Sequence, residues 1–242
     1  MSAISTSEEV FKAAHVSGGY GEVDIIKDIN LVLFGQEIVT IAGTNGAGKS
    51  TLLRALLGML PRVKGELQLN SRNIAALSVE ERIETGLACV PQVANVFRTL
   101  TVLENLQIAL SNLKDGDFET IFSTFPILKQ RAKQAAGSLS GGERQQLAIA
   151  RALIRQPSVI VLDEPTAALA PSLVSSIFDI IVQLPAKGVS VLLVEQRARQ
   201  ALAISSRGYI LDQGQIVLSG SGVDLLENED MARLYLGTAE HT

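Results

Sequence analysis

One eight-residue segment constrains the fold of this chain more than any other. Residues 43–50 read Gly-Thr-Asn-Gly-Ala-Gly-Lys-Ser, which is the pattern G-x-x-x-x-G-K-[ST]. An apolar, β-branched run at 38–42 precedes it, and residues 52–57 continue as a helix with one broad apolar face. In such a strand–loop–helix unit, glycines let successive backbone N–H groups point inward at phosphate oxygens. The segment therefore predicts a nucleoside triphosphate loop in an α/β fold.

The residue types in this loop suit a phosphate chain and its metal ion. We expect a helix to begin near Lys49, so that its unpaired backbone donors and its dipole add positive potential at the loop. The Lys49 ammonium group can reach the outer phosphates, and the Ser50 hydroxyl group can bind Mg²⁺, the predicted cofactor. The residues predicted to contact ATP in this segment are Gly43, Thr44, Asn45, Gly46, Ala47, Gly48, Lys49, Ser50 and Thr51.

An acidic pair follows a second strand much later in the chain. Residues 159–162 are continuously apolar, as in parallel strands covered on both faces by helices, and the run ends in Asp163 and Glu164. Together with the loop at 43–50, this pair predicts a pocket for a nucleoside triphosphate and its Mg²⁺. The alternative is that the two acids cap a helix, because Pro165 follows them.

Composition indicates a compact intracellular protein. The 242 residues are 47% hydrophobic and 19% charged, which suits one large domain or one domain with a subdomain. The net charge of −4 gives no general attraction for nucleic acid or anionic lipid. The single cysteine, Cys89, lies in an apolar segment and fits a reducing compartment, and the two histidines, His15 and His241, are too few for a metal site. We expect no membrane span and no secretion signal.

The chain divides by pattern into an α/β part and a helical part. Residues 1–9 are predicted to be a flexible tail, and the α/β core is predicted at 10–92 and 157–242. Between them, about 93–156 is predicted to be an inserted helical subdomain, with helices at 101–110, 118–125 and 141–154. Capping-box patterns predict helix starts at Ser78 and Thr101. The predicted strands are 11–16, 25–34, 38–42, 65–69, 87–90, 158–162, 189–194, 207–211 and 215–218.

A glycine pair opens the last helix of the predicted insert. Ser140 and Glu143 alone would form a capping box that starts an amphipathic helix. Gly141 and Gly142 argue for more, because glycine costs about 1 kcal/mol against alanine within a helix yet leaves backbone donors open to a bulky anion. This second phosphate-binding surface cannot easily fold onto the same nucleotide as the loop. We therefore expect two chains, each offering its 140–143 segment to the ATP held by the other.

The order of these motifs resembles a known family. Residues 43–50 match Walker A, Gln92 follows Val90-Pro91, residues 139–143 read LSGGE, and Walker B ends in Asp163-Glu164. This order is similar to that of the ATP-binding subunits of ABC transporters, from about residue 10 to 238. Finer features are similar to the LivF type of branched-chain amino acid importers, and they are Ala168-Leu169-Ala170-Pro171, Leu193-Val194-Glu195-Gln196, Arg207-Gly208-Tyr209 and Tyr235-Leu236-Gly237.

The resemblance implies a fold and several residue roles. The fold would be a P-loop NTPase (RecA-like) core with an antiparallel β subdomain and an inserted α-helical subdomain. Asp163 would hold Mg²⁺, directly or through water, and Glu164 would be the general base. Gln92 would bind Mg²⁺ through its amide oxygen and sense the membrane subunit; a glutamine after a proline is otherwise a loop residue. Tyr20, between glycines, would stack on adenine, and a plain turn is its alternative reading.

Two positions depart from the general family pattern. Gln196 stands where most members carry a switch histidine; it can donate to the γ-phosphate and is predicted to be catalytic, but it carries no proton at neutral pH. Ala170 stands where an aspartate is usual. Both changes suit the LivF type. They also leave open a degenerate cassette that binds ATP without hydrolysing it.

The resemblance also implies partners and a location. The partners would be a second ATP-binding subunit (LivG-like or an identical copy), two integral membrane permeases and, indirectly, a periplasmic or extracellular solute-binding protein. The chain would lie on the cytoplasmic side of the bacterial inner membrane as a peripheral subunit. Because the LivF lineage often has glutamate at the position of Gln92, an importer of urea, other amides or other hydrophobic or polar amino acids is one alternative. A soluble ABC ATPase acting on DNA or ribosomes is another, although the acidic balance predicts no nucleic-acid partner.

Overall fold

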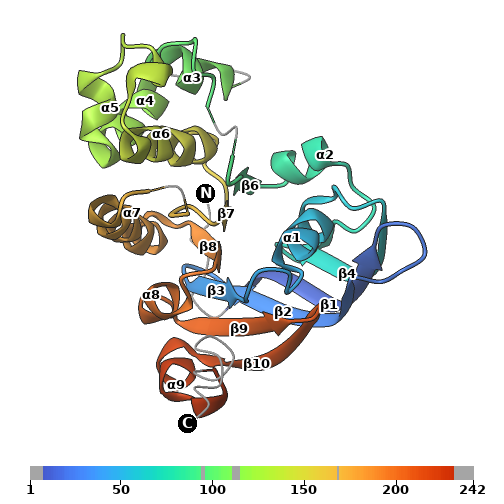
Figure 1. Cartoon of the computed structure of the whole chain (residues 1–242). Helices are drawn as coiled ribbons and strands as arrows, with labels where there is room; N and C mark the ends of the chain where they lie inside the picture. The colour runs from blue at the N-terminus through green and yellow to red at the C-terminus, as the bar shows by residue number, and fades with distance from the viewer. Residues whose placement is uncertain (1–7, 94–95, 111–114, 168, 232–242) are drawn as a thin grey trace.

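Two β-sheets with helices around them make up the molecule. The computed structural model describes residues 8–93, 96–110, 115–167 and 169–231, and for 115–117 the backbone alone. Most of the predicted tail, the predicted Tyr235–Gly237 ending and His241 lie outside these residues. Figure 1 shows helices α3 to α6 gathered at one end of the molecule and both sheets below them.

The larger sheet is six-stranded and mostly parallel. From one edge to the other its strands are β10 (Gln215–Ser221), β9 (Arg207–Asp212), β3 (Ile38–Ala42), β8 (Ser190–Glu195), β7 (Val159–Asp163) and β6 (Leu87–Val90). All neighbouring pairs are parallel except β9 with β10. The continuously apolar runs are buried on both faces, as their sequence predicted. The carboxyl ends of β3, β6, β7 and β8 therefore meet at one edge, where ligands bind in open α/β sheets.

The smaller sheet is four-stranded and antiparallel. Its strands, in spatial order, are β2 (Ile26–Phe34), β1 (Glu9–Gly19), β4 (Arg62–Leu69) and β5 (Arg72–Asn73). The pattern did not predict β5, because two exposed residues carry no apolar periodicity. Polar contacts tie the two sheets together, since the Val32 carbonyl oxygen accepts from Arg207 at 2.6 Å and the Tyr209 hydroxyl oxygen accepts from the Val32 N–H at 3.1 Å.

Most of the predicted helices form close to their predicted bounds. The predicted starts at Ser78 and Thr101 are confirmed: each side chain accepts from the N–H three residues later, at 3.2 and 3.1 Å. Between α3 and α6 the pattern predicted no strand, and among the described residues the structure has only a single bridge, Thr101 with Ala135. The helices are α1 (Lys49–Leu57), α2 (Val79–Glu84), α3 (Val102–Ile108), α4 (Asp115–Thr124), α5 (Pro126–Gln130), α6 (Gly141–Leu153), α7 (Pro171–Gln183), α8 (Ala198–Ala203) and α9 (Gly222–Glu227).

The parallel sheet separates two apolar cores. One lies between the two sheets and α1, where Phe11, Ile41 and Leu52 are fully enclosed. The other joins the opposite face of the sheet to α6, α7 and the helices above them, and it includes Leu147 and Ile177. The helical end is thus anchored to the same strands whose carboxyl ends carry the motifs.

The turn between β9 and β10 supports the loop at 43–48. The Gly214 N–H donates to the Ala47 carbonyl oxygen at 2.8 Å, and the Gly214 carbonyl oxygen accepts from the Lys27 N–H at 2.8 Å. Gly214 has φ +78°, and a Cβ there would lie 1.8 Å from the Ile25 carbonyl oxygen, so this contact requires glycine. Both sheets therefore fix the position of the loop.

Candidate functional site

The loop after β3 wraps around the ammonium group of Lys49. Gly46 and Gly48 have φ +83° and +104°, which the glycine spacing allows, and Gly48 is the N-cap of α1. The Lys49 Nζ donates to the carbonyl oxygens of Gly43 at 2.8 Å and Thr44 at 3.2 Å. This side chain is 6% exposed and lies 3.5 Å from Glu164 Oε1. The predicted helix start at Lys49 is confirmed.

The acidic pair lies at the carboxyl end of β7, opposite Lys49. Burial raises the pKa of Asp163, and the negative charges of Glu164 and Glu195 raise it further, while the positive charges of Lys49 and Arg54 oppose them. Glu164 has φ +43°, and its N–H donates to the Val194 carbonyl oxygen at 2.8 Å. The pair thus lies at the edge of the sheet beside the loop.

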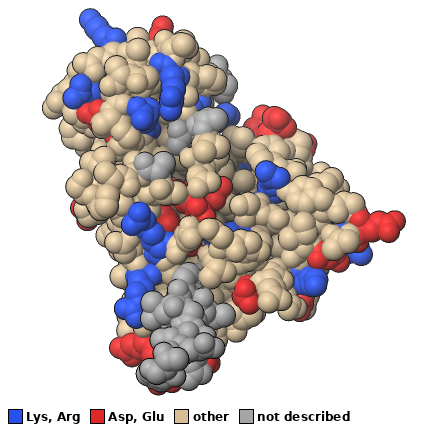
Figure 2. All heavy atoms as spheres, viewed as in Figure 1, with Lys and Arg blue, Asp and Glu red and all other residues tan. Residues whose placement is uncertain are grey.

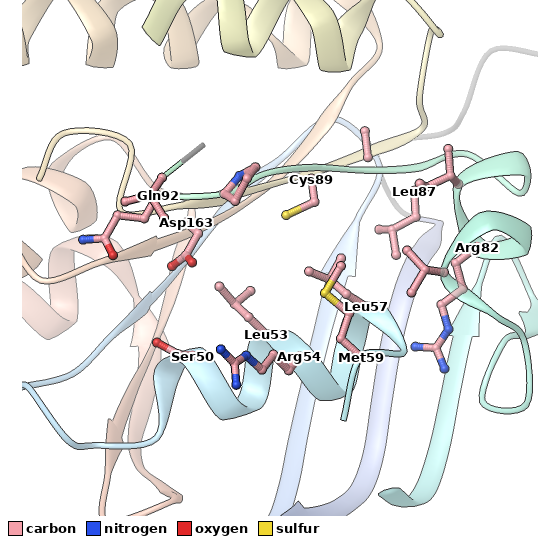
Figure 3. A pocket seen from close by; sticks show the side chains of 15 residues that line it. Ser50, Leu53, Arg54, Leu57, Met59, Arg82, Leu87, Cys89, Gln92 and Asp163 are labelled. Atoms are coloured by element: carbon pink, nitrogen blue, oxygen red, sulfur yellow. The ribbon is translucent and has the colours of Figure 1, made fainter. Parts of the chain in front are cut away.

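Gln92 completes a polar cluster with these groups. Its Nε2 donates to Glu164 Oε2 at 3.0 Å, so Glu164 lies between an amide group and the Lys49 ammonium group. Gln92, Ser50 and Asp163 also line one cavity of about 490 Å³ between α1, α2 and β6. Figure 3 shows these three side chains at one end of the cavity and Arg82 and Leu87 at the other.

The oxygen atoms at this end of the cavity fit Mg²⁺. A hydroxyl group, a carboxylate and an amide come from Ser50, Asp163 and Gln92, and Mg²⁺ prefers one or two carboxylates completed by waters and substrate phosphates. Among the described residues, no group of three or more His, Cys, Asp or Glu side chains could hold a metal ion alone. The site therefore suits a metal ion that arrives with phosphates.

Two further side chains in this cavity bear on its chemistry. Burial, and then the negative charge of Asp163, raise the pKa of the Cys89 thiol to about 12, so the thiol stays protonated at neutral pH. The prediction of a core cysteine is only partly met, because Cys89 packs against the core but is partly exposed and lines the cavity. Arg54 lies on α1 one turn after Ser50 and was missed, although the i, i+4 spacing could have identified it. Its Nη1 donates to the Tyr20 hydroxyl oxygen.

Tyr20 lies at the rim of the site and not in the core. Its side chain is 43% exposed, and the Arg54 guanidinium carbon lies 5.8 Å from the ring centroid. A half-exposed ring held from one side by a cation can stack on a flat ligand from the other. The predicted adenine contact is thus compatible with the position of Tyr20 and stays a prediction.

The segment 140–143 forms its predicted capping box. Ser140 Oγ accepts from the Glu143 N–H at 3.2 Å, and Glu143 Oε2 accepts from the Ser140 N–H at 2.8 Å. Burial acts to raise the pKa of Glu143, but hydrogen bonds from Ser140 and the charge of Arg131 hold it below its ordinary value. Within this chain the segment does not line the cavity of Ser50 and Asp163, and α6 lies apart from α1 (Figure 1).

Gln196 follows β8 at the same edge of the sheet. Its side chain is exposed, and its N–H donates to Glu195 Oε2 at 3.1 Å. Glu195 is buried and was missed, because a glutamate at the end of a strand normally reaches solvent. The only signal was an acid that directly follows a continuously apolar strand. Ala170 is the N-cap of α7 and makes no side-chain capping bond.

Charge is unevenly distributed around the site. Figure 2 shows acidic side chains gathered in the middle of the face, around the ends of β7 and β8, with Lys and Arg over the helical end. If the neighbouring loop binds phosphates, an acidic cluster beside it requires counter-charge, which a divalent cation would supply. Within the part of the chain that the structure describes, no helix is long and apolar enough to cross a bilayer.

Comparison with known proteins gives a consistent result. The sequence profile of the ABC transporter family matches residues 26–167. The high-affinity branched-chain amino acid transport ATP-binding protein BraG of Pseudomonas aeruginosa is 41% identical over 92% of this chain and 97% of that protein. The probable branched-chain amino acid transport ATP-binding protein LivF of Archaeoglobus fulgidus is 38% identical over 96% of this chain and 100% of that protein.

A more distant relative and a solved structure agree with the family match. The lipopolysaccharide export system ATP-binding protein LptB of Escherichia coli K12 is 34% identical over 93% of this chain and 96% of that protein. A crystal structure of an ATP-binding cassette of an ABC transporter, in its ADP conformation, superposes with a TM-score of 0.85 at 27% identity, covering 96% of this chain and 100% of that chain. This chain therefore belongs to the ABC transporter family, and it is an ATPase subunit of that family.

Proposed function

We propose that this chain hydrolyses Mg²⁺-bound ATP at the loop 43–50 to power the import of branched-chain amino acids. The observation that carries the proposal is the convergence of Lys49, Gln92 and Glu164, with contacts of 3.5 and 3.0 Å, in a chain 41% identical to BraG. The names of the two most similar relatives described above supply the substrate class. The contacts of Lys49, Gln92 and Glu164 support the proposed hydrolysis reaction.

Each residue at the edge of the sheet has a role in this reaction. Lys49 and the loop amides bind the phosphates. Ser50, Asp163 and Gln92 would hold Mg²⁺, which would neutralise phosphate charge when bound. Glu164 orients and deprotonates the attacking water. Gln196 donates an amide hydrogen bond to the terminal phosphate. Tyr20 stacks on the adenine ring.

A second ATP-binding chain completes each site. Ser140, Gly141, Gly142 and Glu143 do not line the cavity with Ser50 and Asp163. The capping box already uses the N–H groups of Ser140 and Glu143, so the donors offered to a nucleotide held by another chain are those of Gly141 and Gly142. That chain is a LivG-like subunit or an identical copy. Closure of the two chains on ATP supplies the work, and hydrolysis reopens them.

The membrane partners contact the side of the chain where α2 meets the helical end. Exposed apolar side chains gather there around two hollows, and they are Met59, Ile83, Val93 and Ile108. The first hollow is the cavity that also contains Ser50 and Asp163, so a permease segment against α2 would lie on the same cavity wall as the nucleotide. The proposed permease contact thus involves both parts of the chain: α2 of the α/β core, proposed at 10–92 and 157–242, and the start of the helical subdomain, proposed at about 93–156.

This assembly lies at the cytoplasmic face of the bacterial inner membrane. Two permease subunits span the bilayer, and a solute-binding protein outside delivers the substrate. An importer of urea or amides would use the same ATPase chemistry. Uptake of labelled leucine or urea by vesicles that contain the complete transporter separates the two substrates, and uptake of urea alone would replace the amino-acid proposal.

Replacing Glu164 by glutamine tests the catalytic assignment. Glutamine has the same shape but cannot take a proton, so we expect kcat to fall by about 10² to 10⁴ while Mg²⁺-ATP binding persists. We also expect a closed dimer to accumulate with ATP. Turnover by phosphate release and size by light scattering measure both effects. The exposed Glu66→Gln variant on β4 serves as the control and should behave like wild type. Unchanged turnover in Glu164→Gln would remove Glu164 from the mechanism.

A further inference from the structure

A buried carboxylate lies directly beside the residue that is proposed to contact the terminal phosphate. Glu195 ends β8 and is 1% exposed. Among the ion pairs of the described residues, none involves Glu195. A buried charge without an opposite charge is costly, so its hydrogen bonds must compensate.

The two carboxylate oxygens of Glu195 bind two different loops. Oε1 accepts from the Thr166 N–H at 3.2 Å and from the Thr166 hydroxyl group at 2.7 Å. Oε2 accepts from the N–H groups of Gln196 at 3.1 Å and Arg197 at 3.4 Å. Thr166 is fully buried and lies three residues after Asp163. One side chain thus joins the loop after the acidic pair to the loop that begins with Gln196.

A backbone contact on the adjacent residue reinforces this junction. The Val194 carbonyl oxygen accepts from the Glu164 N–H at 2.8 Å, and Val194 is the parallel partner of Asp163 in the sheet. The end of β8 therefore fixes the backbone of the proposed general base and, through Glu195, the start of the Gln196 loop. The other residues of β8 are all buried and mostly apolar, so the strand does not need a charge for its own packing.

We propose that Glu195 is a positioning residue that holds Gln196 in place to distinguish ATP from ADP. The inference rests on the proposed function, because it requires Gln196 to donate to the terminal phosphate. Glu195 itself does not contact the nucleotide. It fixes the backbone of Gln196 relative to Glu164 and Thr166. The Gln196 side-chain amide group therefore loses less conformational entropy when it donates to the terminal phosphate.

A Glu195→Gln variant tests this role. The glutamine oxygen can accept from one loop only, and its NH₂ group then faces the N–H donors of the other loop. We expect the preference for ATP over ADP to fall about tenfold, the equivalent of one hydrogen bond of about 1.4 kcal/mol, with ADP affinity unchanged. Calorimetric titration of the full chain with Mg²⁺-ATP and with Mg²⁺-ADP gives the ratio directly.

Three further variants complete the design. Gln196→Ala should lose the same preference as Glu195→Gln. Thr166→Val removes one of the four donors and no charge, so the preference should fall in the same direction by about threefold, even if Glu195→Gln does not fold. Glu37→Gln is the matched control: its carboxylate is 12% exposed and bonds Arg207 and the Phe34 N–H outside the site. It should lower the melting temperature and leave the ratio unchanged.

The outcomes separate this inference from the function on which it rests. If folded Glu195→Gln or Thr166→Val keeps the wild-type ratio while Gln196→Ala loses it, Glu195 has no positioning role. If Gln196→Ala also keeps the ratio, Gln196 does not distinguish the nucleotides and the inference is wrong. A wild-type chain that binds neither nucleotide would instead overturn the proposed function.

Discussion

Asp163 is held in an environment that disfavours its charged form. Burial and the nearby charges of Glu164 and Glu195 raise its pKa, and Lys49 and Arg54 only partly oppose this. A carboxylate in such a position is costly to the folded chain and useful once a divalent cation binds it. At the scale of single residues, the proposed Mg²⁺ site would thus bind its metal ion at a cost in folding stability.

Replacing Asp163 by asparagine should therefore stabilise the chain in buffer without nucleotide or Mg²⁺. Because the folded pKa lies above the ordinary value of 3.8, wild-type stability is lost as the pH rises from 3.8 through the folded pKa. Asparagine has no charge to lose. Its melting temperature should exceed that of wild type at pH 7, by about 2–4 °C for each kcal/mol regained, and the difference should shrink toward pH 4.

Circular dichroism melts from pH 4 to 8 measure this effect, with the exposed Asp179→Asn on α7 as control. Adding Mg²⁺-ATP should reverse the order, because wild type gains the metal contact and the asparagine variant does not. A variant that melts at or below the wild-type temperature at pH 7 would show that Asp163 carries no such cost.

At the scale of one element, the N-terminus of α6 presents a similar balance between helix stability and the proposed nucleotide contact. Its capping box already satisfies the start of the helix, so the glycines at 141 and 142 are not needed for capping. Gly142 is buried, and a Cβ there would lie 3.3 Å from Leu173, which is a tight fit against α7. Gly141 is different. A Cβ there would meet only Leu169, at 3.4 Å, which is ordinary contact.

Replacing Gly141 by alanine should raise stability and lower activity together. Alanine favours the helix by up to about 1 kcal/mol, worth about 2–4 °C in melting temperature. The added methyl group would lie where the other chain's ATP makes contact, so ATPase activity and dimer formation should fall. Gly220→Ala on β10, where a Cβ would lie 3.8 Å from Leu225, is the control for the substitution itself. Full activity in Gly141→Ala would argue against a nucleotide at this helix.

The sequence predicted elements best where the signal is local. The capping boxes at Ser78 and Thr101 and the glycine-rich loop before Lys49 depend on neighbours a few residues apart, and all are confirmed. Glu195 and Arg54 were missed because their partners are distant in the chain: Thr166 is 29 residues from Glu195, and Tyr20 is 34 residues from Arg54. Periodicity describes which face of an element is apolar. It does not say which loops a buried carboxylate will join.

At the scale of the whole molecule, one cavity links two surfaces. Ser50 and Asp163 line the same 490 Å³ hollow as Met59 and Ile83, with α1 and β6 as its walls. Movement of α1 or β6 at one surface would reach the other surface through the walls that both share. If ATP and a permease segment bind as proposed, this shared cavity would connect the two sites directly through α1 and β6.

Replacing Ile83 by glutamate should separate the two proposed functions of this cavity, ATP binding and permease contact. The side chain is 37% exposed on α2, so a charge there leaves the core intact but opposes an apolar partner. We expect unchanged ATP binding and basal turnover, and loss of transport in vesicles that contain the permease subunits. Val217→Glu, at 46% exposure on β10, is the matched control and should transport normally. Normal transport by Ile83→Glu would move the proposed permease contact elsewhere.

The backbone at Glu164 carries a consequence for how this chain can evolve. A left-handed φ of +43° suits Asn, Asp or Gly better than glutamate. Once selection for hydrolysis is relaxed, random substitution at this codon would be accepted most readily toward those three residues. A lineage of silent cassettes should therefore accumulate them here, whereas a lineage that needs Glu164 as its general base should keep glutamate against this backbone preference.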